Sequence, residues 1–158
     1  MSLRWYAVVD AAADDALWPM LQRCEARTCL ISGDIHPVLA SAAPYLVALD
    51  DHEPLLEAWQ QHGAGRHWGI LCESDLPLAE LRKQLRRFFQ AKLPDGTIAQ
   101  FRFYDPRVFA TYLPSAPPGQ QAQWFAGVRQ FAVEGDGGRQ HSFRWRAGRL
   151  FDGDTPVG

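Results

Sequence analysis

The chain has 158 residues and a formal net charge of −2, and 47% of its residues are hydrophobic and 22% charged. These values are ordinary for a soluble globular protein, and the overall charge favours neither nucleic acid nor an anionic membrane as a partner. The length predicts a single domain with a sizeable core.

The N-terminal sequence and the cysteine content predict a cytoplasmic protein. The stretch MSLRWYAVVDAAADD contains one basic residue, and acids interrupt its apolar run after Val9, so it does not resemble a secretory signal. No uninterrupted apolar run approaches the roughly 20 residues that a membrane-spanning helix needs. An odd number of cysteines favours buried free thiols over a disulfide framework. They are Cys24, Cys29 and Cys72.

The first part of the chain alternates short strands with short helices. Apolar runs rich in strand formers predict strands over 5–9, 28–31 and 45–49. Asp14 or Asp15 is expected to cap a helix that runs through Arg23, because a carboxylate can accept from the free N–H groups of a first turn. A short helical piece is expected over 36–42.

The next helix and strand are expected on either side of a glycine-rich turn. Asp50 or Asp51 is expected to open the helix, and Gly63 and Gly65 to end it. Its inward side chains are predicted to be Leu55, Leu56 and Trp59. A strand is expected over 67–73, and its alternation predicts that one face carries Trp68, Ile70 and Cys72.

The clearest helix signal lies in SDLPLAELRKQLRRFFQAKLPDG. Ser74 or Asp75 is expected to cap this helix over 78–92, with Pro77 in the first turn, where its missing N–H costs little. Apolar residues recur at helical spacing and predict an amphipathic helix; they are Leu78, Leu81, Leu85 and Phe88 or Phe89. Pro94-Asp95-Gly96 is a turn signal.

The segment QFRFYDPRVFATYLP joins a predicted strand to a predicted helix. Residues 97–104 alternate as a half-buried strand does. Asp105 is expected to cap a helix whose first turn holds Pro106, and one face of this helix carries Val108, Phe109, Tyr112 and Leu113 until Pro114. Arg107 lies in the first turn, where the helix dipole disfavours a cation. We therefore expect Arg107 to have a specific partner, either an acid of the fold or a ligand.

The C-terminal third predicts a helix over 120–126, a strand over 128–134 and a flexible turn over 135–138. A terminal hairpin is expected over 141–146 and 150–151, turning at Ala147-Gly148, with the last seven residues frayed. The whole pattern predicts an α/β fold of one domain, with a mixed β-sheet flanked by helices. Residues 1–134 would form its main body, and 135–158 a C-terminal hairpin and tail of the same domain.

The polar residues do not form a recognised catalytic or metal-binding pattern. The Cys24/Cys29 pair has C-x4-C spacing without a second pair, and Gly63-x-Gly65 does not extend to a dinucleotide fingerprint. The histidines are scattered at His36, His52, His62, His67 and His141. We expect no catalytic residue, no metal and no cofactor, so a Cys–His or metal enzyme is the weakest of the alternatives.

A basic stripe follows the predicted helix over 78–92. It consists of Arg82, Lys83, Arg86, Arg87 and Lys92, and a second basic run consists of Arg139, Arg144, Arg146 and Arg149. Such a stripe can hold phosphates, so a nucleic-acid-binding protein remains an alternative. Because acids elsewhere balance the charge, a solvated face or an acidic protein partner is favoured over nucleic acid.

Four stretches, in this order, resemble a family of domains of unknown function found in type VI secretion effector chaperones, also called adaptor proteins. They are YAVVDAA, APYLVAL, HWGILCESDLPLAELRKQLRRFFQAKLPDG and FRFYDPRVFATYLP, and the likeness spans roughly residues 5–134. The residues that match the family pattern are Trp68-Gly69, Ser74-Asp75, Leu81, Arg86 to Phe88, Pro94-Asp95-Gly96 and Phe101 to Arg107.

The resemblance implies a binding protein rather than an enzyme. Members of that family bind a toxic effector in the cytoplasm and help to load it onto the spike protein of the secretion apparatus, without being exported. Many members continue well past this domain, so this chain would have to use its core domain or its hairpin to hold the effector. Caps, turns and core account for most of the matching residues. The side chains that we expect to face a partner are Arg102, Tyr104 and Arg107, with Arg82 and Arg86 from the basic helix.

Overall fold

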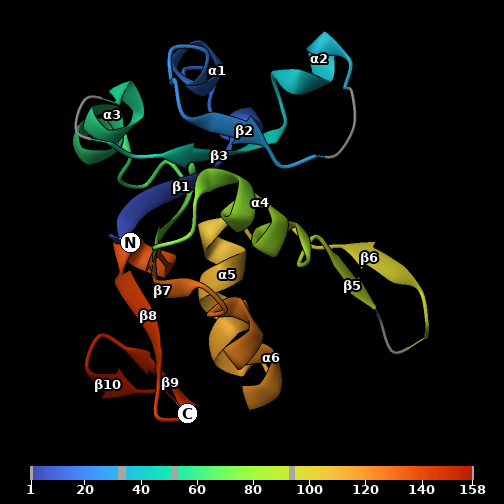
Figure 1. Ribbon diagram of the computed structural model, residues 1–158, viewed down its shortest axis with the longest axis vertical. Helices are drawn as coiled ribbons and strands as arrows, with labels where there is room; N and C mark the ends of the chain where they lie inside the picture. The colour runs from blue at the N-terminus through green and yellow to red at the C-terminus, as the bar shows by residue number, and fades with distance from the viewer. Residues whose placement is uncertain (1, 32–34, 51–52, 93–94, 158) are drawn as a thin grey trace.

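A computed structural model describes residues 2–31, 35–50, 53–92 and 95–157, which form one sheet with helices on both faces and a small separate hairpin (Figure 1). The sheet has the strand order β10-β9-β8-β7-β4-β1-β3-β2. Its strands are β1 (Arg4–Asp10), β2 (Arg27–Cys29), β3 (Pro44–Ala48), β4 (Gly69–Ser74), β7 (Val128–Glu134), β8 (Gln140–Arg146), β9 (Arg149–Asp152) and β10 (Thr155–Pro156).

The helices lie in two groups on opposite faces of the sheet (Figure 1). One group comprises α1 (Leu17–Leu21), α2 (Pro37–Ala40) and α3 (Pro54–His62), and the other α4 (Leu78–Arg86), α5 (Pro106–Ser115) and α6 (Pro118–Trp124). Short 3-10 turns cover Ala11–Ala13 and Asp136–Gly138. The separate hairpin, β5 (Gln90–Lys92) with β6 (Ile98–Gln100), extends away from the sheet beyond α4. Within the described ranges, no helix has the length and apolar character needed to cross a bilayer.

The predicted single α/β domain with flanking helices and C-terminal strands is confirmed, but the strand directions differ from the expected mixture. Every pairing between described strands is antiparallel. The α3 crossover does connect two parallel strands, β3 and β4, but β1 lies between them and pairs with both. Parallel strands are therefore present without being neighbours.

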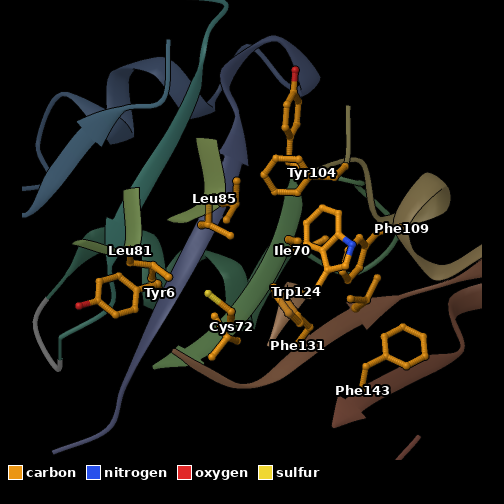
Figure 2. Close-up of a cluster of buried hydrophobic side chains, with 14 of the residues drawn as sticks. Tyr6, Ile70, Cys72, Leu81, Leu85, Tyr104, Phe109, Trp124, Phe131 and Phe143 are labelled. Atoms are coloured by element: carbon orange, nitrogen blue, oxygen red, sulfur yellow. The ribbon is translucent and has the colours of Figure 1, made fainter. Parts of the chain in front are cut away.

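Two cores lie on the two faces of the sheet, and β1 contributes to both. Its alternation places Tyr6 and Val8 in the core under α4 to α6, and Ala7 and Val9 in the core under α1 and α3. The larger core is rich in aromatic rings that pack around Trp124 (Figure 2). The rings nearest to Trp124 belong to Phe88, Phe109, Phe103 and Tyr112, with centroid separations of 3.8, 5.1, 5.2 and 5.9 Å.

The predicted strand 67–73 forms from Gly69 onward, and its expected single face is wrong for Trp68. Ile70 and Cys72 point into the larger core, whereas Trp68 packs in the smaller one, 5.8 Å from Trp59 between ring centroids. Trp68 precedes the strand, and His67 before it has a left-handed φ of 57°. The strand alternation therefore does not extend back to Trp68.

The predicted helix 78–92 ends early, at Arg86. Phe88 and Phe89 follow in a turn, and β5 begins at Gln90. The packing of these two rings explains why the helix ends at Arg86, because Phe88 stacks on Trp124 and Phe89 packs against Phe103. The expected cap also differs: Pro77 is the N-cap residue, while the Ser74 hydroxyl accepts from the Leu76 N–H and donates to the Gly127 carbonyl.

The predicted strand 97–104 is correct only for its first half. β6 ends at Gln100, and the chain then turns inward so that the consecutive residues Phe103 and Tyr104 are both buried. A half-buried strand would have placed these two side chains on opposite faces. The expected helix start at Asp105 is confirmed, but α5 continues through Pro114 to Ser115, and Val108 is 39% exposed.

The remaining predicted helices and strands form with shifted ends, whereas the expected caps of two helices and the frayed terminus are wrong. Ala16 and Glu53 are the N-cap residues of α1 and α3, and neither side chain makes a cap hydrogen bond. The helix expected through Arg23 is reduced to α1, the helix expected at 120–126 begins at Pro118, and α3 begins at Pro54. Asp51 and His52 lie outside the described residues. The C-terminal hairpin turns at Ala147-Gly148, with φ of 52° and 75°. The residues expected to fray include β10, which pairs with β9.

Candidate functional site

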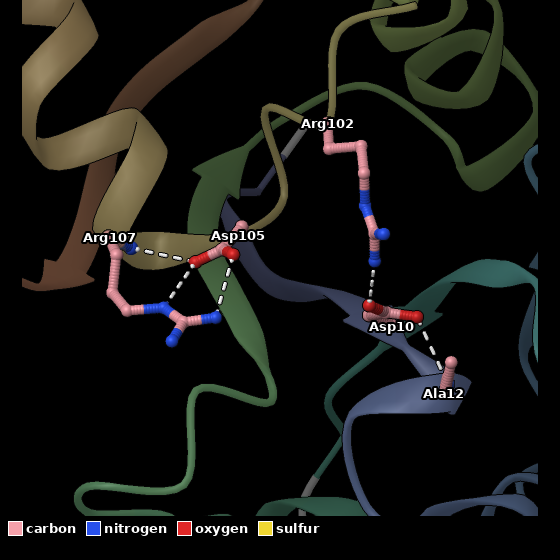
Figure 3. Close-up of polar contacts among 5 residues, drawn as sticks. All are labelled: Asp10, Ala12, Arg102, Asp105 and Arg107. Atoms are coloured by element: carbon pink, nitrogen blue, oxygen red, sulfur yellow. Dashed lines mark hydrogen bonds and ion pairs between the residues drawn. The ribbon is translucent and has the colours of Figure 1, made fainter.

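The segment between β6 and α5 places Arg102 beside the end of β1 (Figure 3). Arg102 Nη2 donates to Asp10 Oδ2 at 2.6 Å, and the other oxygen of Asp10 accepts from the Ala12 N–H at 3.0 Å. The Asp10 side chain is 11% exposed, whereas that of Arg102 is 60% exposed. Asp10 therefore holds the 3-10 turn and one end of an otherwise exposed arginine.

Asp105 and Arg107 form a second, self-contained ion pair at the start of α5 (Figure 3). Asp105 Oδ1 accepts from the backbone N–H of Arg107 at 3.0 Å and from its Nε at 3.1 Å, while Oδ2 accepts from Nη2 at 3.0 Å. Partial burial alone would raise the pKa of Asp105, but the hydrogen bonds and charge of Arg107 lower it below its usual value. The specific partner expected for Arg107 is thus an acid of the fold.

These two ion pairs border a hollow of about 520 Å³, which also contains Arg66 and His67. His67 combines its left-handed backbone with a buried Nδ1 that has no hydrogen-bond partner among the described residues. Both carboxylates in the hollow already accept hydrogen bonds from arginines. The lowered pKa of Asp105 makes it a weak base.

Tyr104 belongs more to the core than to the surface. Its side chain is 9% exposed and packs edge-on against Phe89 and Phe103, at 6.2 and 5.7 Å between ring centroids. The Arg102 guanidinium lies 5.6 Å from the centroid of the Tyr104 ring. Burial raises the pKa of the Tyr104 hydroxyl, which therefore stays protonated at neutral pH. Tyr104 therefore packs in the core and contacts the Arg102 guanidinium with its ring.

The basic residues of α4 divide into two kinds. Arg82 Nε donates to the Cys29 carbonyl at 2.7 Å and its Nη2 to the Ile31 carbonyl at 3.4 Å, so Arg82 holds the sheet edge at β2. Arg86 has a buried Nε without a hydrogen-bond partner, and Arg87 donates to Gln84 at 2.9 Å. Across the part of the chain that the structure describes, no carboxylate forms an ion pair with Arg86 or Arg87.

Arg86, Arg87 and Arg102 meet at an open hollow of about 510 Å³ between the end of α4, the β2–β3 edge and the segment after β6. We call it the basic hollow. Its other lining residues are Leu30, Ile31, Pro44, Phe89, Gln90, Gln100, Phe101 and Tyr104. Three of the five predicted partner-facing residues, Arg86, Arg102 and Tyr104, thus come together here. Arg107 lies in the neighbouring hollow, and Arg82 binds the sheet edge.

Sequence reasoning missed the apolar part of the basic hollow. Phe89 and Phe101 were assigned to a helix and a strand, and Ile31 to the end of a buried strand, although Ile31 is 41% exposed. Phe101 N–H donates to the Phe89 carbonyl at 2.7 Å, which brings the two aromatic residues to the base of the β5–β6 hairpin. The turn signal in the sequence at 94–96 could have predicted that the chain reverses here and brings Phe101 back to Phe89.

The arrangement from β1 to α6 corresponds to the region matched by a family model. The model for a domain of unknown function, DUF4123, matches residues 5–123. The chain belongs to the DUF4123 family. No curated protein and no solved structure matches it. In this DUF4123 chain the matched region includes both ion pairs and the basic hollow, while β7 to β10 extend the same sheet beyond it.

Other reactive side chains of this DUF4123 domain are held within the fold. Cys72 is fully buried, and burial raises the pKa of its thiol to about 12, so it is poorly suited to act as a nucleophile at neutral pH. Burial also raises the pKa of Cys24 to about 11. His141 Nδ1 lies 2.7 Å from Asp152 Oδ2 and ties β8 to β9. Among the described residues, no three His, Cys, Asp or Glu side chains gather as a metal site.

Proposed function

We propose that this chain is a cytoplasmic adaptor that binds a toxic effector of a type VI secretion system and helps to load it onto the spike protein. The proposal starts from the ordered stretches that resemble effector chaperones, of which the segment Phe101 to Arg107 is the most specific. Membership of DUF4123 agrees with that resemblance without assigning a role.

The observation that carries the proposal is the basic hollow. Arg86 and Arg87 bring positive charge that no described acid neutralises, and the aromatic side chains of Phe89 and Phe101 lie beside them. Arginine and aromatic residues are enriched at the centres of protein interfaces, where they supply both directed hydrogen bonds and apolar area. A protein partner fits this composition better than a small polar substrate does.

Co-expression with the products of the adjacent genes tests the proposal. We expect the chain to elute together with a neighbouring effector in size-exclusion chromatography, and the complex to associate with the spike protein. Neither the effector nor the spike needs to be known in advance, because both are expected near this gene. Failure of every neighbouring effector and spike protein to form a complex would reject the adaptor function.

Nucleic-acid binding through α4 is the second candidate, and the observation in its favour is that Arg86 and Arg87 form no ion pair with a described acid. Two features weaken it. Arg82 is engaged with carbonyls of the sheet edge, and Lys92 lies beyond the end of the helix. If the chain binds nucleic acid, its affinity for an arbitrary DNA duplex will fall steeply as the salt concentration rises. Binding will disappear when Arg86 and Arg87 are both replaced by Glu.

A further inference from the structure

We propose that the basic hollow binds an acidic segment of the effector that also carries an apolar side chain, with the acids meeting Arg86 and Arg87 and the apolar group lying against Phe89, Phe101 and Ile31. This inference rests on the proposed adaptor function for the identity of the partner. The chemistry of the occupant follows from the hollow itself.

The charge of the hollow selects an acidic occupant. Arg102 is committed to Asp10 at 2.6 Å, so its orientation is set by the fold. Arg86 and Arg87 have no such acid among the described residues, and the Nε of Arg86 is buried without a hydrogen-bond partner. A guanidinium presents donors in a fixed fork that matches the two oxygens of a carboxylate. Carboxylates of a partner can therefore complete contacts that the described residues do not make.

The apolar residues that line the hollow select an apolar group. They are Leu30, Ile31, Pro44, Phe89 and Phe101. Ile31 is 41% exposed and Phe101 is only partly buried, so both lose further contact with water when an apolar side chain enters. The volume of about 510 Å³ accommodates a few side chains, which suits a segment and not a folded domain.

The sheet edge beside the hollow is closed to strand addition where it borders α4. β2 is the last strand of the sheet, and an uncovered edge strand would offer its carbonyls to an incoming peptide. Arg82 already donates to the carbonyls of Cys29 and Ile31 on this edge. The occupant is therefore recognised through its side chains, and its sequence matters more than its ability to extend the sheet.

A fluorescein-labelled peptide of alternating glutamate and leucine residues tests this inference by fluorescence anisotropy. The matched peptides replace every glutamate by glutamine, or every leucine by serine. We expect the unmodified peptide to bind the whole chain at least about tenfold more tightly than either matched peptide. Equal binding of the glutamine peptide would remove the role of charge, and equal binding of the serine peptide would remove the apolar contact. Absence of binding would overturn the inference.

Two double variants locate the binding. Arg86→Gln with Arg87→Gln is expected to weaken peptide binding at least about tenfold. Arg139→Gln with Arg149→Gln removes the same charge from the C-terminal region and is expected to leave binding unchanged. Circular dichroism checks that both proteins are folded. An equal loss in the two variants would mean a general charge effect, and no loss in the first would exclude the hollow; either result overturns the inference.

Two further measurements separate this inference from its competitors. A single-stranded oligothymidine that displaces the peptide at lower concentration than unlabelled peptide does would identify a nucleic-acid site and overturn the inference. Retention of the effector complex by the Arg86→Gln, Arg87→Gln variant would overturn the inference while leaving the adaptor function standing. Loss of that complex in this variant, but not in the Arg139→Gln, Arg149→Gln control, supports both.

Discussion

Two sets of arginines near one another have different relations to the fold. Arg102, after β6, and Arg107, in the first turn of α5, each face a carboxylate of the protein, at 2.6 and 3.0 Å. Arg86 and Arg87, at the end of α4, face none among the described acids. The first set shapes the segment that carries it, whereas the second leaves its charge available for another molecule.

The difference also changes which residues of the FRFYDPR stretch are worth testing for binding. Asp105 and Arg107 bind each other, and Asp10 fixes Arg102. Phe103 and Tyr104 are buried. A substitution in this stretch is therefore expected to act first on stability, and one at Arg86 or Arg87 first on binding.

The largest expected effect comes from removing the buried ring that anchors the segment. Phe103 is fully buried and packs against both Phe89 and Trp124. Phe103→Ala should lower the free energy of unfolding by about 3–5 kcal/mol, because it removes apolar contacts and leaves a cavity. Chemical denaturation followed by tryptophan fluorescence measures the change. A loss below about 1 kcal/mol would show that the segment is not anchored by this ring.

The next effect in size comes from the ion pair at the end of β1. Asp10→Ala removes both the partner of Arg102 and the acceptor of the Ala12 N–H, so we expect a loss of about 1–2 kcal/mol in the free energy of unfolding. Asp10→Asn retains an acceptor for Ala12 and removes only the charge, so its loss should be smaller. Equal losses in the two variants would assign the whole effect to the charge.

Asp105→Ala should cost about 1 kcal/mol at neutral pH through loss of the helix cap. Because the folded-state pKa of Asp105 lies below its unfolded value, its contribution is present above the unfolded pKa of about 4 and is lost as the pH falls through the folded pKa. The stability difference between the wild type and Asp105→Ala should therefore shrink below about pH 4. A constant difference from pH 7 to pH 3 would mean that the ionised carboxylate contributes nothing.

The sequence predicted the local features of this region and missed their tertiary arrangement. The cap at Asp105 and the helix after it follow from short-range chemistry, since Asp-Pro suits a first turn in any fold. The end of α4 at Arg86 does not follow from short-range chemistry, because it depends on the stacking of Phe88 on Trp124, which is far along the chain. The helical spacing of apolar residues predicted a helix through residue 92, but tertiary packing of Phe88 and Phe89 ends it at Arg86.

The same distinction applies to the candidate site. Arg102 and Tyr104 were predicted to face a partner because caps, turns and core did not account for them, and Arg86 because it belongs to the basic stripe. The structure brings all three to the basic hollow. The role of Arg82 was missed, because its acceptors are the carbonyls of Cys29 in β2 and of Ile31 just after it, more than fifty positions earlier. A basic stripe on a helix says nothing by itself about which of its charges the fold already uses.

The smallest expected change in stability comes from Arg86 and Arg87, which face no described acid. Arg86→Gln with Arg87→Gln should alter the free energy of unfolding by no more than about 0.5 kcal/mol, because no ion pair among the described residues is lost. Arg82→Gln, one turn earlier on the same helix, is the matched control and should cost about 1 kcal/mol through its carbonyl contacts. Parallel urea titrations compare them. If the double variant proves the less stable of the two, Arg86 and Arg87 serve the fold as Arg82 does, and the contrast between the two sets of arginines disappears.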